Sequence, residues 1–401
     1  MSGVDFLGKL LDGVLVEWKD VGEVAQILNG FAFESSKYSS SGIRVIRISD
    51  VQKGKMSDKD KKFYPTSNVD EINKYLLRED DLVMSLTGNV GRVAMLSKKD
   101  LPAALNQRVA CIRANEKKTL TRYLFHFFDQ VSFETEAMAN ATGGGQKNMS
   151  TKWLSSYKIP IPCPENSKKS LEIQAEIVRI LDAFTELTAE LTAELTTRKK
   201  QYNYYRDQLL SFEDGAVEWK VLGGLTTIKT GQSVNKQMIA ADPGEYAVIN
   251  SGKEPLGYIN VWNTVDDPIG ITSRGAGVGS ITWRDGKYFR GNLNYSVTIK
   301  NKTELATRYL YHVLQKMQME IQALCTFDGI PALNAGNLKE LQVPVPPLGV
   351  QERIASTLDK FDDLTNSLSE GLPREIELRQ KQYEYYRNLL LSFPKPESAT
   401  A

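Results

Sequence analysis

The sequence Arg-Lys-Lys-Gln-Tyr-Asn-Tyr-Tyr-Arg at residues 198–206 returns almost unchanged as Arg-Gln-Lys-Gln-Tyr-Glu-Tyr-Tyr-Arg at residues 379–387. Each copy continues into Leu-Ser-Phe, which ends at Phe212 and at Phe393. Self-similarity of this kind marks an internal repeat, and the architecture is best inferred from the repeat before any local motif. The chain therefore contains one building block twice, and this motif recurs at an offset of 181 residues.

Further repeated motifs surround this stretch. Val-Glu-Trp-Lys occupies residues 16–19 and 217–220, and Ile-Pro-Ile-Pro at 159–162 corresponds to Val-Pro-Val-Pro at 343–346. The sequences between these motifs agree only at scattered places: Gly88 and Gly91 with Ala276 and Gly279, Leu105-Asn106 with Leu293-Asn294, and residues 122–126 with 308–312. The matching segments 122–126 and 308–312 end in His126 and His312, which we interpret as shared framework residues. The order is globular, helical, globular, helical, as expected of two related heads with different targets.

The helical blocks carry a coiled-coil pattern. Residues 171–212 contain no proline or glycine, and their apolar side chains recur in steps of four and three, which is a heptad pattern. A tandem Thr-Ala-Glu-Leu at 188–195 inserts four extra residues, a stutter. The second block, 350–393, is interrupted by Gly-Leu-Pro at 371–373, which predicts two helices in line or a kink. Since an amphipathic helix needs a partner, we expect the two blocks to pair antiparallel.

The globular blocks mix strand and helix signals, so each is expected to be an α/β (α+β) head. Strands are predicted at residues 43–48, 81–86, 109–112, 246–249 and 296–299, and helices at 120–128 and 305–317. Each block ends in a polar or Gly-rich loop, a short helix and a Pro-rich strand. Because residues 10–13 resemble the end of a helical block, the expected arrangement has circular pseudo-two-fold symmetry, with both termini at one junction.

Composition excludes several classes of protein. Fifty Lys and Arg against 49 Asp and Glu give a net charge of +1, so the chain has no general polybasic coat, although a local basic patch remains compatible with this balance. No apolar run approaches the length of a membrane span, and residues 1–11 lack a signal peptide, which predicts a cytoplasmic protein. Cys111, Cys163 and Cys325 are far apart, and only two histidines occur, so neither a disulfide framework nor a metal site is expected.

The sequence also lacks the common catalytic motifs. It contains no GxxxxGK[ST] phosphate loop, no GxGxxG in a βαβ setting, no HExxH and no Asn- or Asp-Pro-Pro-aromatic motif. A binding protein without a cofactor of its own is predicted. Arg, Lys, Asn and Gln can contact base edges and phosphates. The candidate DNA-contacting residues are Arg92, Gln107, Arg108, Gln146, Lys147, Asn148 and Lys152 in the first block, and Lys236, Asn250, Ser251, Lys253, Arg274, Arg284 and Asn334 in the second.

These features together resemble the specificity subunit of type I restriction-modification enzymes. The Pro-rich motifs followed by Gln174 or Gln351 are similar to the entry into that family's conserved regions. The tandem repeat and residues 371–383 are similar to the IC subfamily. The resemblance implies target recognition domains at 1–162 and 213–346, conserved helical regions at 163–212 and 347–393, and a tail at 394–401. It assigns Thr188, Leu191, Thr192 and Leu195 to the spacer.

The resemblance also implies partners and a mechanism. The subunit has no catalytic activity and binds double-stranded DNA together with two modification subunits, which use S-adenosylmethionine, and restriction subunits, which use ATP and Mg²⁺. Two different heads imply an asymmetric, bipartite target whose half-site separation the helices set. Two alternatives stay open: a coiled-coil adaptor whose heads bind protein or carbohydrate, and a self-contained methyltransferase. Salt-dependent DNA binding would separate the first from the DNA hypothesis, and binding of S-adenosylmethionine to the purified chain would identify the second.

Overall fold

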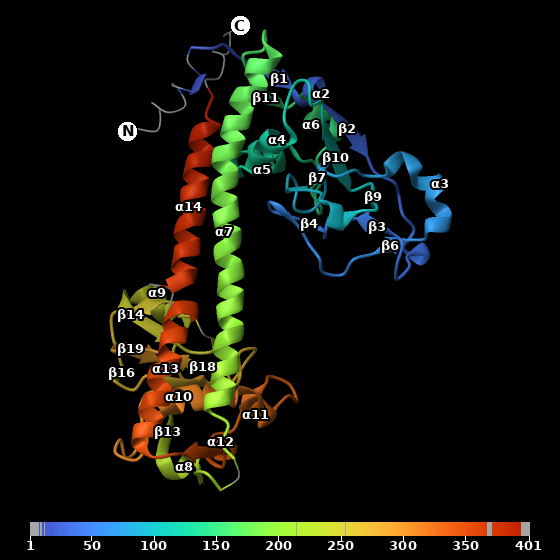
Figure 1. Ribbon diagram of the computed structural model, residues 1–401. Coiled ribbons are helices and arrows are strands. Elements are labelled where there is room, and N and C mark those ends of the chain that lie inside the picture. Colours follow the sequence, from blue (N-terminus) through green and yellow to red (C-terminus); the bar gives the residue numbers. More distant parts are fainter. Residues whose placement is uncertain are drawn as a thin grey trace. The chain divides into compact units, whose positions relative to one another are not determined.

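The computed structural model describes residues 8, 10, 11, 13–213, 215–252, 254–366 and 371–393 (Figure 1). Two compact units make up the chain. Unit 1 contains Met1–Glu190 and Ile376–Ala401, and unit 2 contains Leu191–Glu375. Each unit consists of one head and of parts of the long helices. The expected combination of two α/β heads with long helical segments is confirmed. The bounds of the five segments drawn from the sequence remain predictions, and the tail at 394–401 lies outside the described residues.

Head 1 consists of short strands and helices. Its strands are β1 (Val16–Asp20), β2 (Ala25–Asn29), β3 (Ile43–Ile46), β4 (Val51–Gln52), β5 (Lys55–Met56), β6 (Phe63–Tyr64), β7 (Leu82–Ser85), β8 (Val93–Met95), β9 (Ala103–Leu105), β10 (Val109–Ala114) and β11 (Lys158–Pro162). Its helices are α2 (Val21–Val24), α3 (Val69–Ile72), α4 (Thr121–Phe128), α5 (Val131–Asn140) and α6 (Thr151–Ser156), with 3₁₀ turns η1 (Ser35–Lys37), η2 (Thr66–Asn68), η3 (Asn73–Tyr75) and η4 (Lys98–Asp100).

The central sheet of head 1 has the strand order β2-β10-β7-β8, and all of its neighbouring strands are antiparallel. Its inner strands are buried on both faces. Leu82 and Met84 of β7 join the apolar core that contains α4, while Val83 joins a second core on the other face, with β9. Successive residues of a strand point to opposite faces, so burial of both faces requires an uninterrupted apolar run. This explains why β7 and β10 are correctly predicted from the sequence.

Head 2 repeats this plan. Its strands are β12 (Glu218–Val221), β13 (Thr226–Thr230), β14 (Pro243–Ile249), β15 (Tyr258–Ile259), β16 (Thr264–Val265), β17 (Ile269–Thr272), β18 (Ile281–Trp283), β19 (Lys287–Arg290), β20 (Asn294–Ile299), β21 (Cys325–Thr326), β22 (Ala332–Leu333) and β23 (Gln342–Val345). Its helices are α8 (Leu222–Leu225), α9 (Lys236–Ala241), α10 (Thr307–Lys316), α11 (Gln318–Ala323) and α12 (Ala335–Lys339). The sheet order β13-β20-β17-β18 matches that of head 1, and β15-β14-β19-β16 form a second sheet.

The two short repeated motifs pair with each other in each head. Strand β1 carries Val-Glu-Trp-Lys and runs antiparallel to the Pro-rich β11, so that Trp18 lies opposite Pro160. In head 2, β12 pairs with β23 in the same way, and Trp219 lies opposite Pro344. These two-stranded ribbons join the beginning of each head to its end. Proline is tolerated here because a two-stranded ribbon consists of edge strands.

The long helices are α7 (Ser167–Leu209), α13 (Leu348–Asn366) and α14 (Gly371–Leu390). Helix α7 has 43 residues, which corresponds to about 65 Å. Helix α13 ends at Asn366 and α14 begins at Gly371, so the Gly-Leu-Pro at 371–373, where the sequence predicts an interruption, forms the first turn of a described helix. Gly371 has a φ of +76°, and a Cβ atom there would lie 2.5 Å from the carbonyl oxygen of Asp363. Only glycine therefore fits at this junction.

Antiparallel pairing of the helices is visible inside each unit. In unit 1, α14 lies beside the first part of α7 (Figure 1), and the rings of Phe184 and Tyr386 stack at 5.2 Å. In unit 2, α13 packs against the last part of α7, and the rings of Tyr205 and Phe361 stack at 5.4 Å. Among the described residues, no helix is long and apolar enough to cross a membrane.

Candidate nucleic-acid interface

Three segments of head 1 meet where strand β7 of its central sheet ends and the neighbouring strand β10 begins. We call the surface formed by these segments the edge of the head. The Leu86 N–H, at the end of β7, donates to the carbonyl oxygen of Arg108 at 3.0 Å. The carbonyl oxygen of Leu86 accepts the N–H of Met149 at 2.8 Å. The loop after β7, the turn before β10 and the loop at 142–148 are thereby held together. Thr142 and Asn148 exchange backbone hydrogen bonds, so the Gly-rich loop is a short hairpin.

Most of the candidate residues of head 1 lie on this edge and are exposed. Gln107 and Arg108 form the turn before β10, and Gln146, Lys147 and Asn148 lie on the hairpin. Thr87, which the sequence analysis missed, donates from Oγ1 to Asn148 Oδ1 at 3.2 Å. Only the tertiary contact identifies Thr87.

Two candidates of head 1 do not join this group. Arg92 is half-buried, and its Nη1 donates to Gln52 Oε1 at 3.4 Å while its Nε lies 3.8 Å from Glu134 Oε1. Lys152 is on α6, where it lines a shallow hollow with the acidic residues Asp20 and Glu23. Both side chains therefore have acidic neighbours within their own head.

Head 2 has the same edge with a different surface. The Ser273 N–H donates to the carbonyl oxygen of Leu293 at 2.9 Å, and the Leu333 N–H donates to the carbonyl oxygen of Ser273 at 2.8 Å. The hairpin of β21 and β22 contacts the loop after β17, because the Gly275 N–H donates to the Pro331 carbonyl oxygen at 2.9 Å. Exposed Arg274 lies on this loop. An isolated bridge between Arg274 and Ala332 places this candidate beside the hairpin.

The remaining candidates of head 2 have different environments. Asn250 is buried, and its Oδ1 accepts the Leu293 N–H at 2.9 Å, so it supports the edge from inside. Asn334 caps α12, accepting the Gly336 N–H at 2.7 Å. Arg284 follows β18 at the end opposite to Arg274, as the pairing of Ile269 with Trp283 requires.

Three further candidates complete the set. Ser251 is exposed directly after Asn250, and a Cβ atom on Gly277 would lie 2.7 Å from the Ser251 carbonyl oxygen. Lys236 is the first residue of α9 and is exposed. Lys253 lies outside the described residues. The structure thus places Ser251 near the loop after β17 and leaves Lys236 on a separate element.

The hydrogen bonds also correct two correspondences between the heads. Gly88 donates to Lys147 as Gly275 donates to Pro331, so Gly88 corresponds to Gly275 and not to Ala276. Parallel bridges join Phe31 to Asn106 and Gln232 to Gly291. Leu105-Asn106 therefore correspond to Arg290-Gly291, and the expected match with Leu293-Asn294 is wrong. The turns differ in sequence, and only the backbone contacts align them.

Each head is fixed to its helices by the same set of side chains. Gln174 is buried on α7, and its Oε1 accepts the Leu120 N–H at 3.0 Å, just before α4. Gln351 on α13 accepts the Ala306 N–H at 2.8 Å, just before α10. These hydrogen bonds satisfy backbone donors that a helix start leaves unpaired. The repeated glutamine is thus explained by the anchoring of the head.

The two histidines also fix the heads to the helices, which confirms that they are framework residues. The histidine of each head, with the aspartate and tyrosine that it contacts on the helices, is called the anchor of that head. In unit 1, His126 Nε2 lies 2.7 Å from Asp182 Oδ1 on α7, and His126 Nδ1 lies 3.0 Å from the Tyr383 hydroxyl on α14. Arg122 also contacts Asp182. Burial lowers the pKa of His126, and hydrogen bonds from His126 and Arg122 outweigh burial and lower the pKa of Asp182. A neutral imidazole that donates to an ionised carboxylate fits both shifts.

Unit 2 contains the same arrangement. His312 Nε2 lies 2.7 Å from Asp359 Oδ1 on α13, and Arg308 Nε donates to the same atom at 2.6 Å. His312 Nδ1 lies 3.3 Å from the hydroxyl of Tyr202 on α7. Tyr202 and Tyr383 lie within the heptad-patterned helical blocks, but both are 5 % exposed and packed against the heads. The tyrosine of one helical block thus completes the anchor of the head that packs against the other block.

The tandem Thr-Ala-Glu-Leu lies where the two units divide, between Glu190 and Leu191. Leu191 and Leu195 are half-buried, as expected of seam positions, and Thr192 is exposed. Thr188 Oγ1 donates to the carbonyl oxygen of Phe184 at 2.8 Å. The four spacer residues thus belong to a continuous helix and lie between the two histidine anchors.

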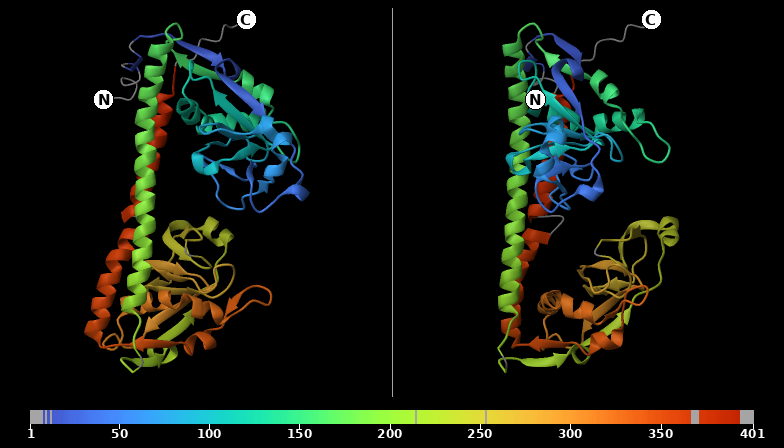
Figure 2. Two further views of the ribbon diagram at one scale, coloured as in Figure 1. Left: turned by 45° about the vertical axis from the view of Figure 1, so that its right-hand side comes forward. Right: turned by 90° about the vertical axis from the view of Figure 1, so that its right-hand side faces the viewer.

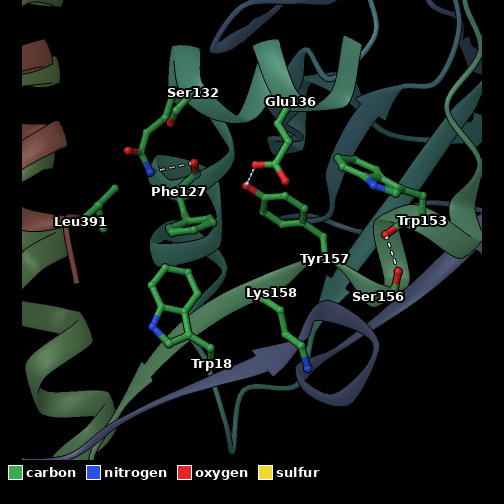
Figure 3. Close-up of a pocket in the computed structure, with 10 residues that line it drawn as sticks. Trp18, Phe127, Ser132, Glu136, Trp153, Ser156, Tyr157, Lys158 and Leu391 are labelled. Carbon is green, nitrogen blue, oxygen red and sulfur yellow. Dashed lines mark hydrogen bonds between the residues drawn. The ribbon is translucent and has the colours of Figure 1, made fainter. Parts of the chain in front are cut away.

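A hollow of about 660 Å³ in head 1 lies beside the β1–β11 ribbon (Figure 3). Aromatic rings line it, and two hydrogen bonds join groups of its wall: Tyr157 donates to Glu136 Oε2 at 3.0 Å, and Ser156 Oγ donates to the Trp153 carbonyl oxygen at 3.1 Å. In the described part of the chain, no group of three His, Cys, Asp or Glu side chains could hold a metal ion.

The comparisons with known proteins point in one direction. The profile of the family described as "Type I restriction modification DNA specificity domain" matches residues 14–198 and 216–378. The chain is 34 % identical to the "Type I restriction enzyme EcoR124I/EcoR124II specificity subunit" of Escherichia coli, and the match covers both chains completely. It is 32 % identical to the "Type I restriction enzyme EcoprrI specificity subunit" of Escherichia coli, over 92 % of this chain and 93 % of that one.

Solved structures share the fold. The crystal structure of the type I restriction-modification system S subunit from M. genitalium superimposes with a TM-score of 0.65 at 16 % identity, over 96 % of this chain and 98 % of that one. A chain from a study of complex assembly and conformational transition of the type I R-M system gives a TM-score of 0.56, also at 16 % identity, over 94 % and 98 % of the two chains.

Proposed function

This chain belongs to the type I restriction-modification DNA specificity family, and we propose that it selects the target sequence by contacting each half-site with the exposed edge of one head. The main support for this proposal is that both heads form the same edge with the same backbone hydrogen bonds and cover it with different side chains. A shared frame with a variable surface is what two different half-sites require. The target is therefore asymmetric and bipartite.

The helices give this proposal its geometry. Asp182 and Tyr202 anchor the two heads on the same uninterrupted α7. Because an α-helix has a fixed rise and rotation per residue, the number of residues between these anchors sets a defined separation and rotation. The tandem Thr-Ala-Glu-Leu between them is the element that determines the half-site spacing. This tandem and residues 371–383 support placement in the IC subfamily.

The chemistry belongs to partner subunits in this proposal. Two modification subunits, which dock on the helical regions, supply S-adenosylmethionine and methylate adenine, and restriction subunits supply ATP- and Mg²⁺-dependent activity. The modification subunit extrudes its target base, because a stacked base is inaccessible. The complex acts in the cytoplasm, where it meets cellular DNA. The near-neutral charge of this chain fits a division of labour in which partners contribute much of the phosphate contact.

Exchange of one head tests the proposal. Residues 14–162 are replaced by the corresponding head of a relative, and the methylated sites are mapped in cells that also express the modification and restriction subunits. We expect one half-site to change while the other half-site and the spacer remain. Changes in both half-sites would contradict the assignment of one half-site to each head. Absence of salt-dependent DNA binding by the complex would favour the adaptor alternative.

A further inference from the structure

The hairpin of head 2 presents two large apolar side chains to solvent. Phe327 is 64 % exposed and Ile330 is 69 % exposed, and both lie in the connection between β21 and β22, which projects from the head (Figure 2). Gly329 between them has a φ of +94°, which permits the tight turn. Folding leaves both side chains largely in water, so they contribute little hydrophobic stabilisation to the head.

The corresponding hairpin of head 1 has the same anchor and a different tip. Gly88 donates to Lys147 at 3.2 Å where Gly275 donates to Pro331 at 2.9 Å, and Thr87 bridges to Asn148 where Arg274 bridges to Ala332. The tip of head 1 is Gly-Gly-Gly-Gln-Lys at 143–147, and that of head 2 is Phe-Asp-Gly-Ile-Pro at 327–331. One backbone position thus carries hydrogen-bonding groups in one head and apolar groups in the other.

We propose that the tip formed by Phe327 and Ile330 recognises the 5-methyl group of a thymine in the major groove of the half-site bound by head 2. This inference rests on the proposed function. The thymine methyl is the apolar group that base pairs display in the grooves, and it lies in the major groove. The flat ring of Phe327 and the branched aliphatic chain of Ile330 can both pack against such a methyl group.

The charged neighbours of the tip support a major-groove contact. Asp328 lies between the two apolar residues and is exposed, and a carboxylate is repelled by phosphates but accepts a hydrogen bond from cytosine N4 in the major groove. Arg274 at the base of the hairpin is exposed and supplies the positive charge that phosphate or guanine contact needs. The tip therefore favours pyrimidine edges. The Gln146, Lys147 and Asn148 of head 1 favour purine edges instead.

A uracil scan of the target tests the proposal, since uracil is thymine without the methyl group. The dissociation constant of the assembled complex for its mapped target is measured with each thymine of both half-sites replaced in turn by uracil. One replacement in the half-site of head 2 is expected to weaken binding about fourfold, the factor that corresponds to removing one buried methyl group. The double variant F327A/I330A is expected to bind the thymine and uracil duplexes equally.

A matched variant controls for loss of exposed apolar surface in general. Val265 is 46 % exposed on β16, near the end of β17 that is opposite to Arg274, so V265A should keep the thymine preference. Absence of thymine from the half-site of head 2, or equal binding of every uracil duplex by the unmodified chain, would overturn the proposal. In both cases specific binding persists, so the proposed function stands. Loss of all sequence preference in the unmodified complex would instead refute both.

Discussion

One additional Thr-Ala-Glu-Leu unit after Leu195 is expected to lengthen the spacer between the half-sites and to leave the recognised bases unchanged. The insertion enters α7 between Asp182, which contacts the anchor of head 1, and Tyr202, which contacts that of head 2. The insertion lies at the start of unit 2, five residues after the division at Glu190 and Leu191. Each head therefore keeps its own histidine–aspartate–tyrosine contacts, while the length of α7 between Asp182 and Tyr202 changes.

The size of the change follows from helix geometry. Four residues add about 6 Å and about 400°, which is roughly 40° beyond one full turn. Base pairs of B-DNA rise by about 3.4 Å and rotate by roughly 35°. The added rotation corresponds to about one base pair and the added length to about two. The spacer should therefore lengthen by one or two base pairs, and deletion of one unit should shorten it by the same amount.

The assay is sequencing of methylated adenines in cells that express the variant with its modification and restriction subunits. The substitution T192A is a matched control, because Thr192 is exposed and alanine leaves the helix length unchanged. This control should methylate at the original spacing. An insertion variant that keeps the original spacing, or that changes the bases of either half-site, would refute the role of α7 as the element that sets the separation.

Three other predictions concern single side chains. R108A should weaken binding of the target at least fivefold through loss of a base or phosphate contact. K152A, which removes a lysine beside Asp20 and Glu23, should change affinity less than twofold. Titration of labelled duplex compares the dissociation constants of the two variants. Burial lowers the pKa of His126 from 6.5, so near pH 6.5 the unfolded chain takes up a proton that the folded chain does not, and stability falls as the pH drops through this range. H126Q should therefore have a smaller difference in melting temperature between pH 7.5 and 5.5 than the unmodified chain. An unchanged difference would contradict the assignment. G30A should lower the free energy of unfolding by about 1–3 kcal/mol, because its Cβ would lie 2.2 Å from the backbone of Asn106, while G144A, with nothing within 4 Å, should have little effect in denaturant titrations.

Sequence reasoning was accurate where the physical signal is local. The strands β7 and β10 are buried on both faces, so their apolar runs are continuous. Helix α7 shows a heptad pattern because one stripe is covered along its length. The repeat correctly indicated two heads that share a framework. It could not show that the two repeated short motifs pair as the β1–β11 and β12–β23 ribbons, because strand pairing joins residues that are far apart in the sequence.

The candidate interface was only partly accessible from residue types. Arg108 and Lys147 lie on the exposed edge of head 1, but Arg92 lies beside Glu134, and Asn250 is buried with its oxygen accepting a backbone N–H. An arginine or asparagine has the same chemistry in all of these places. Whether it is free to contact DNA depends on neighbours from distant segments, which composition and spacing do not encode.

The sequence by itself determined that this protein is a duplicated block with two variable heads and two nearly identical helical regions, because repetition and heptad periodicity are properties of the chain. The tertiary structure decided how each head is held. Tyr202 and Tyr383 occupy equivalent positions of the repeat, and each completes a histidine–aspartate anchor whose aspartate comes from the other helical block. The physical reason is antiparallel pairing: it brings the end of one helical region to the beginning of the other, so residues some 200 positions apart share one buried hydrogen-bond network.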